Sequence, residues 1–372
     1  MILYHLWDTF VPMGQKRTHR EGCVVVKYLF KIQEKIAPEL IFVVENRYNI
    51  LRNIYYNQPV GRRILAEKTN ITERIVRKEL DFLCTRGLIN ISRSGAVITE
   101  DGLAFLPELD KYIKEIKGIK LLEEKLNKIL GLDEVFIVPG ILEHSTVVQE
   151  IGRFAARLVK KMLKDSDILA VTGGSTLAQV AYAMRESDRP MDITVVPGRG
   201  GLGEEVEIQA NTISSTIAKK LGGNYHLLYV PDSIKEENVD RIINEPAIQR
   251  VLQCLKKANI LLHGIGSAEV MAARRDMSEE EIKELLAKGA VAEAFGYYFS
   301  EKGQIVHITT SVGLHLEDLR YIDKVIVVAG APEKARAILS VISPEYHDLL
   351  ITDEFTAREM LYLKGVRQGE EL

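Results

Sequence analysis

Hydrophobic and polar positions follow two different rhythms along the chain, and the change falls near residue 100. Before it, apolar residues recur at helical spacing, as at Leu40, Val43, Val44, Tyr48 and Leu51. From about residue 133 onward, short apolar runs are each followed by a Gly/Pro turn and a helix-like segment. The first rhythm predicts a small helical domain. The second predicts a mainly parallel sheet covered by helices on both faces, which makes the fold class α/β.

The expected strands follow directly from these runs. They are EVFIVPG (134–140), DILAVTGG (167–174), DITVVPGRGG (192–201), HLLYVPD (226–232), ANILLHGIG (258–266), QIVHITTS (304–311), DKVIVVAGA (323–331) and DLLITDE (348–354). We therefore expect an N-terminal extension at 1–25, a winged-helix domain at 26–100, a connecting helical segment at 101–131 and a Rossmann-like domain at 132–372. The connecting segment has an apolar stripe at Leu122, Leu126, Ile129 and Leu130; it either packs on its own domain or also supports dimerisation.

Residues 59–102 carry the pattern of a winged helix-turn-helix. GRRILAEKT predicts a short helix, Asn70 and Ile71 a turn, and Thr72 the N-cap of a second helix that ends near Arg86. Ile75, Val76, Leu80 and Leu83 should form its buried face, and LINISRSGAVITEDG should form a two-stranded wing. Candidate base contacts are Thr72, Glu73, Arg74 and Arg77, and candidate phosphate contacts are Arg62, Arg63, Lys78, Arg86 and Arg93.

Charge and composition fit a DNA-binding head on a larger body. Residues 1–99 carry 16 Lys and Arg against 9 Asp and Glu, whereas the whole chain has a net charge of −3. We expect double-stranded operator DNA as a partner, no membrane segment, no secretion signal and hence a cytoplasmic protein. The 3 cysteines form no metal-ligand spacing, so neither a zinc site nor a disulfide framework is expected.

Glycine-rich loops after the expected strands predict a phosphate pocket. Gly173 and Gly174 allow close backbone approach, and Ser175 and Thr176 open a helix whose free N–H groups favour an anion. Arg199 lies in a second glycine loop, Lys334 near a third helix start, and Glu293 in an apolar setting. A sugar bisphosphate needs two anion sites. We therefore expect TGGST with Lys334 to bind one phosphate, Arg199 the other, and Glu293 the hydroxyls.

The motifs T-G-G-S-T, P-G-R-G-G, G-I-G-x-A, A-E-A-F-G-Y-Y-F and A-G-x-x-K-x-x-A-I, in this order, resemble the effector domain of the SorC family of bacterial sugar-responsive repressors. That domain is similar in fold to sugar-phosphate isomerases and deaminases. Segments 32–63 and 71–83 resemble the members that control glycolytic operons, and the match covers about residues 30–340. The resemblance implies a repressor with fructose-1,6-bisphosphate as effector. The implied ligand residues are Gly173, Gly174, Ser175, Thr176, Arg199, Gln209, Arg274, Glu293 and Lys334.

We expect a sensor and not an enzyme. Enzymes of the related fold resemble one another in an Asp-Gly-His segment after the G-I-G turn, and here that segment reads GIGSAEVMAARR. His263 lies in an apolar strand, where a core histidine is more common than a catalyst. We therefore expect a repressor, as a dimer or tetramer, with no catalytic residue, metal or cofactor. A regulator that senses another sugar or sugar-alcohol phosphate, or an isomerase or deaminase, are the alternatives.

Overall fold

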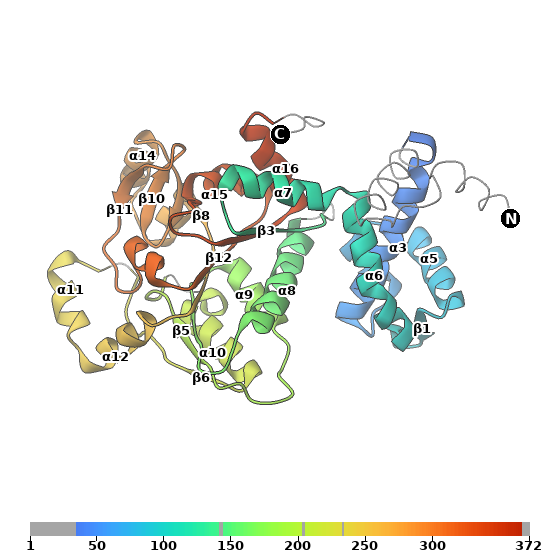
Figure 1. The fold of residues 1–372 in the computed structure, drawn as a ribbon, viewed down its shortest axis with the longest axis horizontal. Coiled ribbons are helices and arrows are strands. Elements are labelled where there is room, and N and C mark those ends of the chain that lie inside the picture. Colours follow the sequence, from blue (N-terminus) through green and yellow to red (C-terminus); the bar gives the residue numbers. More distant parts are fainter. Residues whose placement is uncertain (1–34, 141–143, 203–204, 233, 367–372) are drawn as a thin grey trace, which may run out of the picture. The chain divides into compact units, whose positions relative to one another are not determined.

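The computed structural model describes residues 35–140, 144–202, 205–232 and 234–366 (Figure 1). The chain divides into two compact units, Met1–Ile116 and Lys117–Leu372. The division splits the segment 101–131 that the sequence suggested as a connection. Its first part is helix α6 (Glu100–Ile116), which contacts α3 (Pro38–Asn57), and its second part is α7 (Ile119–Leu130), which packs on β3 (Glu134–Val138). The predicted extension 1–25 lies outside the described residues.

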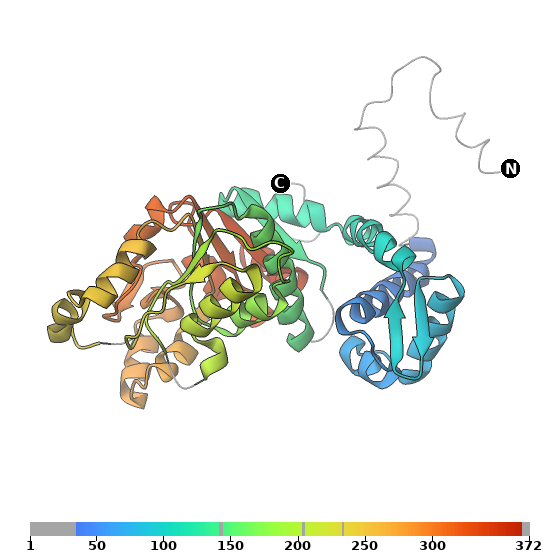
Figure 2. The ribbon, with the colours of Figure 1, turned by 90° about the horizontal axis from the view of Figure 1, so that it is seen from below.

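The first unit contains the predicted order of helix, turn, helix and hairpin. Helices α4 (Arg62–Thr69) and α5 (Glu73–Thr85) are followed by β1 (Ile89–Ser92) and β2 (Gly95–Ile98), which pair antiparallel. Asn70 ends α4 in the left-handed conformation, with φ 53°. Figure 2 shows the two strands side by side next to the helices of this unit. Leucine, isoleucine and valine side chains from α3 to α6 and from the hairpin form one buried core.

The buried face of α5 differs from the prediction at two positions. Val76, Leu80 and Leu83 are buried as expected, but the side chain of Ile75 is 41% exposed. Glu79 takes its place in the interior, where its Oε2 accepts a hydrogen bond of 2.6 Å from Nε of Arg47 on α3. The ion pair neutralises the carboxylate, so Glu79 can be buried on the inward face of α5, where the hydrophobic pattern predicted Ile75.

The second unit is built on a seven-stranded sheet in which every pair is parallel. The strand order is β3, β13 (Leu349–Asp353), β12 (Lys324–Val328), β7 (Ile260–His263), β4 (Ile168–Val171), β5 (Thr194–Pro197) and β6 (Asn224–Tyr225). The predicted strand 226–232 is wrong, because β6 is a two-residue edge strand that ends before it. The chain order reverses between β4 and β7, so the loops after these two strands diverge and leave a crevice.

Helices cover both faces of this sheet, as the sequence predicted. One face carries α8 (His144–Met162), α9 (Ser175–Ala183) and α10 (Ala210–Leu221), whose apolar side chains join one core cluster. The other face carries α7, α12 (Pro246–Leu255), α15 (Ala335–Val341) and α16 (Glu354–Leu363) and forms a second cluster. Alternate residues of β3 belong to the two clusters, because successive side chains of a strand point to opposite faces.

A separate four-stranded antiparallel sheet lies in the segment 266–308. Its order is β11 (Ile305–Ile308), β10 (Tyr297–Ser300), β9 (Ala290–Ala294) and β8 (Gly266–Ser267). The run QIVHITTS is therefore a strand, but of this second sheet. Helices α13 (Ala268–Arg274) and α14 (Glu279–Ala287) connect β8 to β9, and α11 (Glu236–Ile243) precedes α12.

No helix among the described residues combines the length and the apolar composition needed to cross a membrane. Cys84 and Cys254 are free thiols, and Cys23 lies outside the described residues.

Candidate anion-binding pocket and nucleic-acid surface

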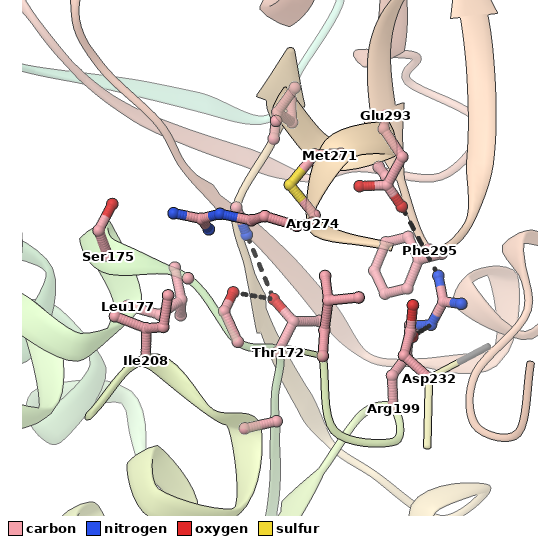
Figure 3. A pocket seen from close by; sticks show the side chains of 18 of the residues that line it. Thr172, Ser175, Leu177, Arg199, Ile208, Asp232, Met271, Arg274, Glu293 and Phe295 are labelled. Carbon is pink, nitrogen blue, oxygen red and sulfur yellow. Dashed lines mark hydrogen bonds and ion pairs between the residues drawn. The ribbon is translucent and has the colours of Figure 1, made fainter. Parts of the chain in front are cut away.

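A pocket opens at the carboxyl ends of β4, β5 and β7, at the crevice where the strand order reverses. The structure brings all the effector residues suggested by the sequence into its lining, although the first and the last, Gly173 and Lys334, are 161 positions apart in the chain. These residues are Gly173, Gly174, Ser175, Thr176, Arg199, Gln209, Arg274, Glu293 and Lys334. Figure 3 shows Arg274 extending toward Ser175, whereas Arg199, Asp232 and Glu293 gather at the opposite side.

One side of the pocket is formed by the start of α9. Gly174 precedes the helix with φ 125°, a conformation that residues with a side chain rarely adopt. Its N–H donates to the carbonyl of Ile208 at 2.8 Å, and a Cβ on Gly173 would lie 2.9 Å from the same oxygen. The first N–H groups of a helix have no partner inside the helix, so the turn at Ser175 presents donors and the positive end of the helix dipole to the pocket.

Two cations stand beside this helix start. Arg274 ends α13, and Lys334 lies in the short 3-10 turn η3 (Pro332–Lys334). Neither forms an ion pair with a carboxylate of the described residues. Burial lowers the pKa of Lys334, and the positive charge of Arg274 lowers it further, while Glu333 opposes both effects. An anion bound between the two cations would relieve their repulsion, so this side of the pocket suits a phosphate.

The opposite side is a buried group of two arginines and two acids. Nε of Arg199 lies 2.9 Å from Oδ1 of Asp232, and Nη1 of Arg199 lies 3.7 Å from Oε1 of Glu293. Arg275 completes the group: its Nε donates to Oδ2 of Asp232 and its Nη2 to Oε1 of Glu293, both at 2.8 Å. Burial lowers the pKa of Arg199, whereas in Arg275 the two acids outweigh the effect of burial and raise the pKa. The group carries no net charge.

The neutral group changes what Arg199 can offer a ligand. Its charge is already balanced, and Gly296 lies so close that an added Cβ would be 2.7 Å from Nη2 of Arg199. Gln209 is also engaged, because its amide accepts from the N–H of Leu202 at 2.9 Å and donates to the carbonyl of the same residue. Gln209 thus holds the glycine loop in shape. Assigning the second phosphate to Arg199 stays a prediction, and its balanced charge does not favour it.

Sequence reasoning missed the partners that hold the pocket residues. Asp232 follows a run that was expected to be a strand, and Arg275 stood beside Arg274 as one of two equivalent arginines. The pocket is also lined by Met271 and Phe295, which supply apolar surface beside the charged group. The one signal was the pair of adjacent arginines, and only the fold shows that one faces Ser175 and the other is buried.

A buried polar cluster connects the pocket loop with the beginning of this unit. Oδ2 of Asp353, at the end of β13, accepts from the N–H of Ala331, three residues before Lys334, at 3.0 Å. The next residue, Glu354, is 6% exposed, and its Oε2 accepts from Nζ of Lys117 and from the N–H of Gly140, each at 3.1 Å. Its Oε1 accepts from Nε and Nη2 of Arg358 at 3.1 and 3.0 Å. Lys117 is the first residue of the second unit.

His263, the residue nearest to a catalytic histidine in the sequence, is a core residue. Its side chain is fully buried, its Nδ1 lies 3.1 Å from the carbonyl oxygen of Gly264, and its ring centroid lies 5.1 Å from that of His347. Burial and the neighbouring His347 lower the pKa of His263 to about 3, and burial lowers that of His347 to about 4. Both rings are therefore neutral at physiological pH.

The candidate nucleic-acid contacts lie on the surface of the first unit. Arg74, Arg77 and Lys78 are exposed on one face of α5, and Arg93 is at the hairpin turn between β1 and β2. Thr72, Arg62 and Arg63 are also exposed. Glu73 is half-buried and pairs with Arg62, whose Nε lies 2.6 Å from Oε1 of Glu73. The pair reduces the positive charge at the helix start, so the free cations are concentrated farther along α5.

Comparison with known proteins agrees with this division of the chain. Residues 43–113 match the CggR N-terminal DNA binding domain, and residues 114–362 match a sugar-binding domain. The chain belongs to the SorC family of sugar-binding transcriptional regulators, and it is a DNA-binding regulator, not an enzyme.

Its relatives include the central glycolytic genes regulators of Priestia megaterium and Bacillus subtilis. They are 41% and 40% identical to this chain over 90% of its length, and the matches cover 99% and 98% of theirs. A crystal structure of a SorC family regulator from Enterococcus faecalis is 38% identical, covers 65% of this chain and 99% of its own, and has a TM-score of 0.60. The full-length sorbitol operon regulator SorC from Klebsiella pneumoniae shares the fold at 20% identity, with a TM-score of 0.61 over 86% of this chain and 98% of its own.

Proposed function

We propose that this protein is a cytoplasmic repressor of a glycolytic operon whose binding to operator DNA is relieved by a sugar phosphate. One observation carries the proposal: residues from six separate segments converge on one pocket with a helix start and two cations at one end and a buried polar group at the other. The names of the relatives from Priestia megaterium and Bacillus subtilis, the central glycolytic genes regulators, support a glycolytic operon as the target. Fructose-1,6-bisphosphate is the first effector to test. The balanced charge of Arg199 favours a monophosphate such as fructose-6-phosphate as the second candidate.

On the DNA side, we assign α5 as the recognition helix of a winged helix-turn-helix and the hairpin of β1 and β2 as the wing. Thr72, Glu73, Arg74 and Arg77 would meet base edges near the start of α5. Arg62, Arg63, Lys78, Arg86 and Arg93 would contact phosphates, with Arg62 doing so only where its pairing with Glu73 allows. The exposure of all of these residues except the half-buried Glu73 supports this assignment.

The proposed mechanism is thermodynamic linkage in a homo-oligomer, a dimer or tetramer. The sugar phosphate binds one arrangement of the assembled subunits better than another, and the other arrangement spaces the recognition helices to fit the operator. A ligand of equal affinity for both arrangements would shift nothing. The cluster from Ala331 through Asp353 and Glu354 to Lys117 gives the pocket a packed polar connection to the residue at which the second unit begins.

Fluorescence anisotropy of the purified protein on its own upstream DNA tests the proposal. At fixed salt, fructose-1,6-bisphosphate and fructose-6-phosphate are added in separate titrations, because phosphate contacts make DNA affinity depend strongly on salt. We expect specific binding that at least one of the two sugars weakens. If specific DNA binding is tight but neither sugar alters it, the effector assignment is refuted. If the protein does not bind the DNA specifically, the assignment as a repressor is refuted.

A further inference from the structure

Ala331 has a backbone conformation that an alanine rarely adopts. It lies between β12 and the turn η3, and its φ is 99° with ψ 127°. At this φ the Cβ of an L-residue crowds the backbone, so glycine is the usual occupant. The next residue, Pro332, favours an extended ψ such as the one observed, but together with a negative φ. The strain at Ala331 therefore lies in its φ.

Asp353 holds Ala331 in this conformation. Its Oδ2 accepts from the N–H of Ala331 at 3.0 Å, and the two residues are 1% and 2% exposed. A Cβ on Gly330 would lie 2.6 Å from the same oxygen, so the glycine permits the close approach. Relief of the strain by a flip of the peptide between Gly330 and Ala331 would break this hydrogen bond and leave a buried N–H without a partner, which is costly.

Ala331 passes the restraint on to Lys334. The carbonyl of Ala331 accepts from the N–H of Lys334 at 2.9 Å, and this hydrogen bond closes η3. Lys334 lines the pocket, where burial lowers its pKa. Because burial disfavours the charged form, a lysine on a relaxed loop would turn its ammonium group toward water. The strained peptide thus keeps a partly desolvated cation at the anion-binding end of the pocket.

The two oxygens of Asp353 have separate tasks. Oδ1 accepts from the N–H groups of Phe355 and Thr356, each at 3.0 Å, and so caps α16. Oδ2 binds Ala331 and also accepts from the hydroxyl of Thr356. One oxygen therefore begins a helix and the other restrains the pocket loop, so a substitution can remove the second task and keep the first.

We propose that Asp353 is a positioning residue for phosphate binding: it keeps Ala331 in a strained conformation that holds Lys334 in the pocket. Asp353 is not part of the pocket lining and acts through these two residues. The inference rests on the proposed sugar-phosphate effector and adds what keeps the lysine in place before the ligand arrives.

Asp353→Asn in the full-length protein tests the proposal. Asparagine is a favoured N-cap, so its oxygen can still cap α16 while its NH₂ group faces Ala331. The hydroxyl of Thr356 can accept from that NH₂ group, but the N–H of Ala331 cannot. We expect the affinities for fructose-1,6-bisphosphate and fructose-6-phosphate, measured by calorimetric titration, each to fall about tenfold, since strain of the usual size at such a residue corresponds to roughly that factor.

Ala331→Gly should rescue this loss. Glycine adopts a φ of 99° without strain, so the loop no longer depends on the hydrogen bond to Asp353. We expect the double variant to recover to within about threefold of the unsubstituted affinity, and Ala331→Gly alone to stay within about twofold. Ser166→Gly is the matched control. It relieves another left-handed residue, with φ 70°, that is exposed and outside the pocket lining, so it should not restore binding.

Thermal unfolding measures the strain without any ligand. An Ala→Gly change ordinarily lowers stability, because it raises the conformational entropy of the unfolded chain. At Ala331 the relief of strain should offset this, so the Tm of Ala331→Gly should equal or exceed that of the unsubstituted protein. Ala337→Gly, at a buried alanine in α15, should lower the Tm. If Asp353→Asn alone does not fold, folding of the double variant provides the same rescue.

The outcomes separate the inference from the proposed function. If the unsubstituted protein binds neither sugar, the effector class is refuted and the inference falls with it. If it binds them, but Asp353→Asn has no effect or Ala331→Gly does not restore what is lost, the positioning role is refuted and the effector class stands. A Tm of Ala331→Gly as low as that of Ala337→Gly also refutes it. Loss with Asp353→Asn and recovery with Ala331→Gly, but not with Ser166→Gly, establish it.

Discussion

Replacing Glu354 by glutamine should destabilise the second unit. The size of the loss measures how much the polar contacts between the pocket loop and Lys117, the first residue of that unit, contribute to its stability. The carboxylate accepts on both sides, from Lys117 and Gly140 through Oε2 and from Arg358 through Oε1. A glutamine has one oxygen and one NH₂ group, so in either orientation of the amide the NH₂ group faces donors of the protein. The favoured orientation loses the hydrogen bonds from Arg358, whose side chain is 38% exposed. It keeps those from the more buried Lys117 and from Gly140.

The structure sets the size of the effect. Hydrogen bonds to a charged group contribute about 1.5–3 kcal/mol, and exposure of Arg358 reduces its share, so we expect a loss of about 2 kcal/mol. For a unit of this size that corresponds to a drop in Tm of roughly 4–8 °C. Differential scanning calorimetry of the full-length protein measures it. Glu359→Gln, on the same helix, is the matched control, because Glu359 forms no ion pair among the described residues.

The same variant has a functional readout. If the polar cluster transmits the state of the pocket, Glu354→Gln should bind sugar and DNA separately with near-normal affinity, while the sugar changes DNA affinity several-fold less. Anisotropy titrations with and without sugar give this coupling. An unchanged Tm would refute the energetic argument, and full coupling despite a lowered Tm would show that the cluster is structural only.

Three further predictions follow from the site and the core. Arg77→Ala should lower operator affinity by about 1–3 kcal/mol and relax base preference, whereas Lys78→Ala should weaken all DNA equally and reduce the salt slope by about 1; anisotropy on operator and scrambled DNA distinguishes them. Lys334→Ala should weaken sugar phosphate binding at least tenfold without weakening binding of unphosphorylated fructose, as measured by calorimetry, since it removes a cation with no acidic partner. The folded pKa values of His263 and His347, about 3 and about 4, lie below the unfolded value, so stability should be fully present above about pH 6.5 and fall on acidification. Protonation of each histidine in the unfolded state should lower the free energy of unfolding by about 1.5 kcal/mol between pH 6.5 and 5. His347→Asn, whose amide oxygen can still accept from the N–H of Ser343, should remove one of these two contributions. Equal pH slopes of the unfolding free energy for this variant and the unsubstituted protein, measured by denaturant unfolding, would contradict this.

The sequence predicted those parts of the fold that local patterns determine. The strands β3, β4, β5, β7, β12 and β13 lie in largely apolar runs, because a parallel sheet that is covered on both faces buries the side chains of both faces in apolar surroundings. The run 226–232 looked the same but packs as a loop beyond a short edge strand. The hairpin of β9 and β10 was not predicted, since its alanines and Glu293 match neither rhythm.

The local features of the candidate site could also be predicted from the sequence, but the contacts between distant segments could not. Glycine loops and helix starts are local signals, so the sequence identified Gly173 to Thr176, Arg199 and Lys334 in the lining, but not Asp232, Arg275, Met271 or Phe295. It could not show that Arg199 is neutralised, because the acids that balance it, Asp232 and Glu293, are 33 and 94 positions away in the chain. The interior position of Glu79 escaped prediction for the same reason: its partner Arg47 belongs to another helix.

Each end of the pocket draws on both parts of the second unit. The helix start at Ser175 and Lys334 belong to the parallel sheet and its crossovers, but Arg274 beside them belongs to the antiparallel segment 266–308. At the other end, Arg275 and Glu293 belong to that segment, whereas Arg199 and Asp232 lie in loops of the parallel-sheet part. An exchange of the antiparallel segment alone between relatives would therefore separate Arg275 from Asp232, so a regulator meant to answer to a new metabolite should inherit both parts together.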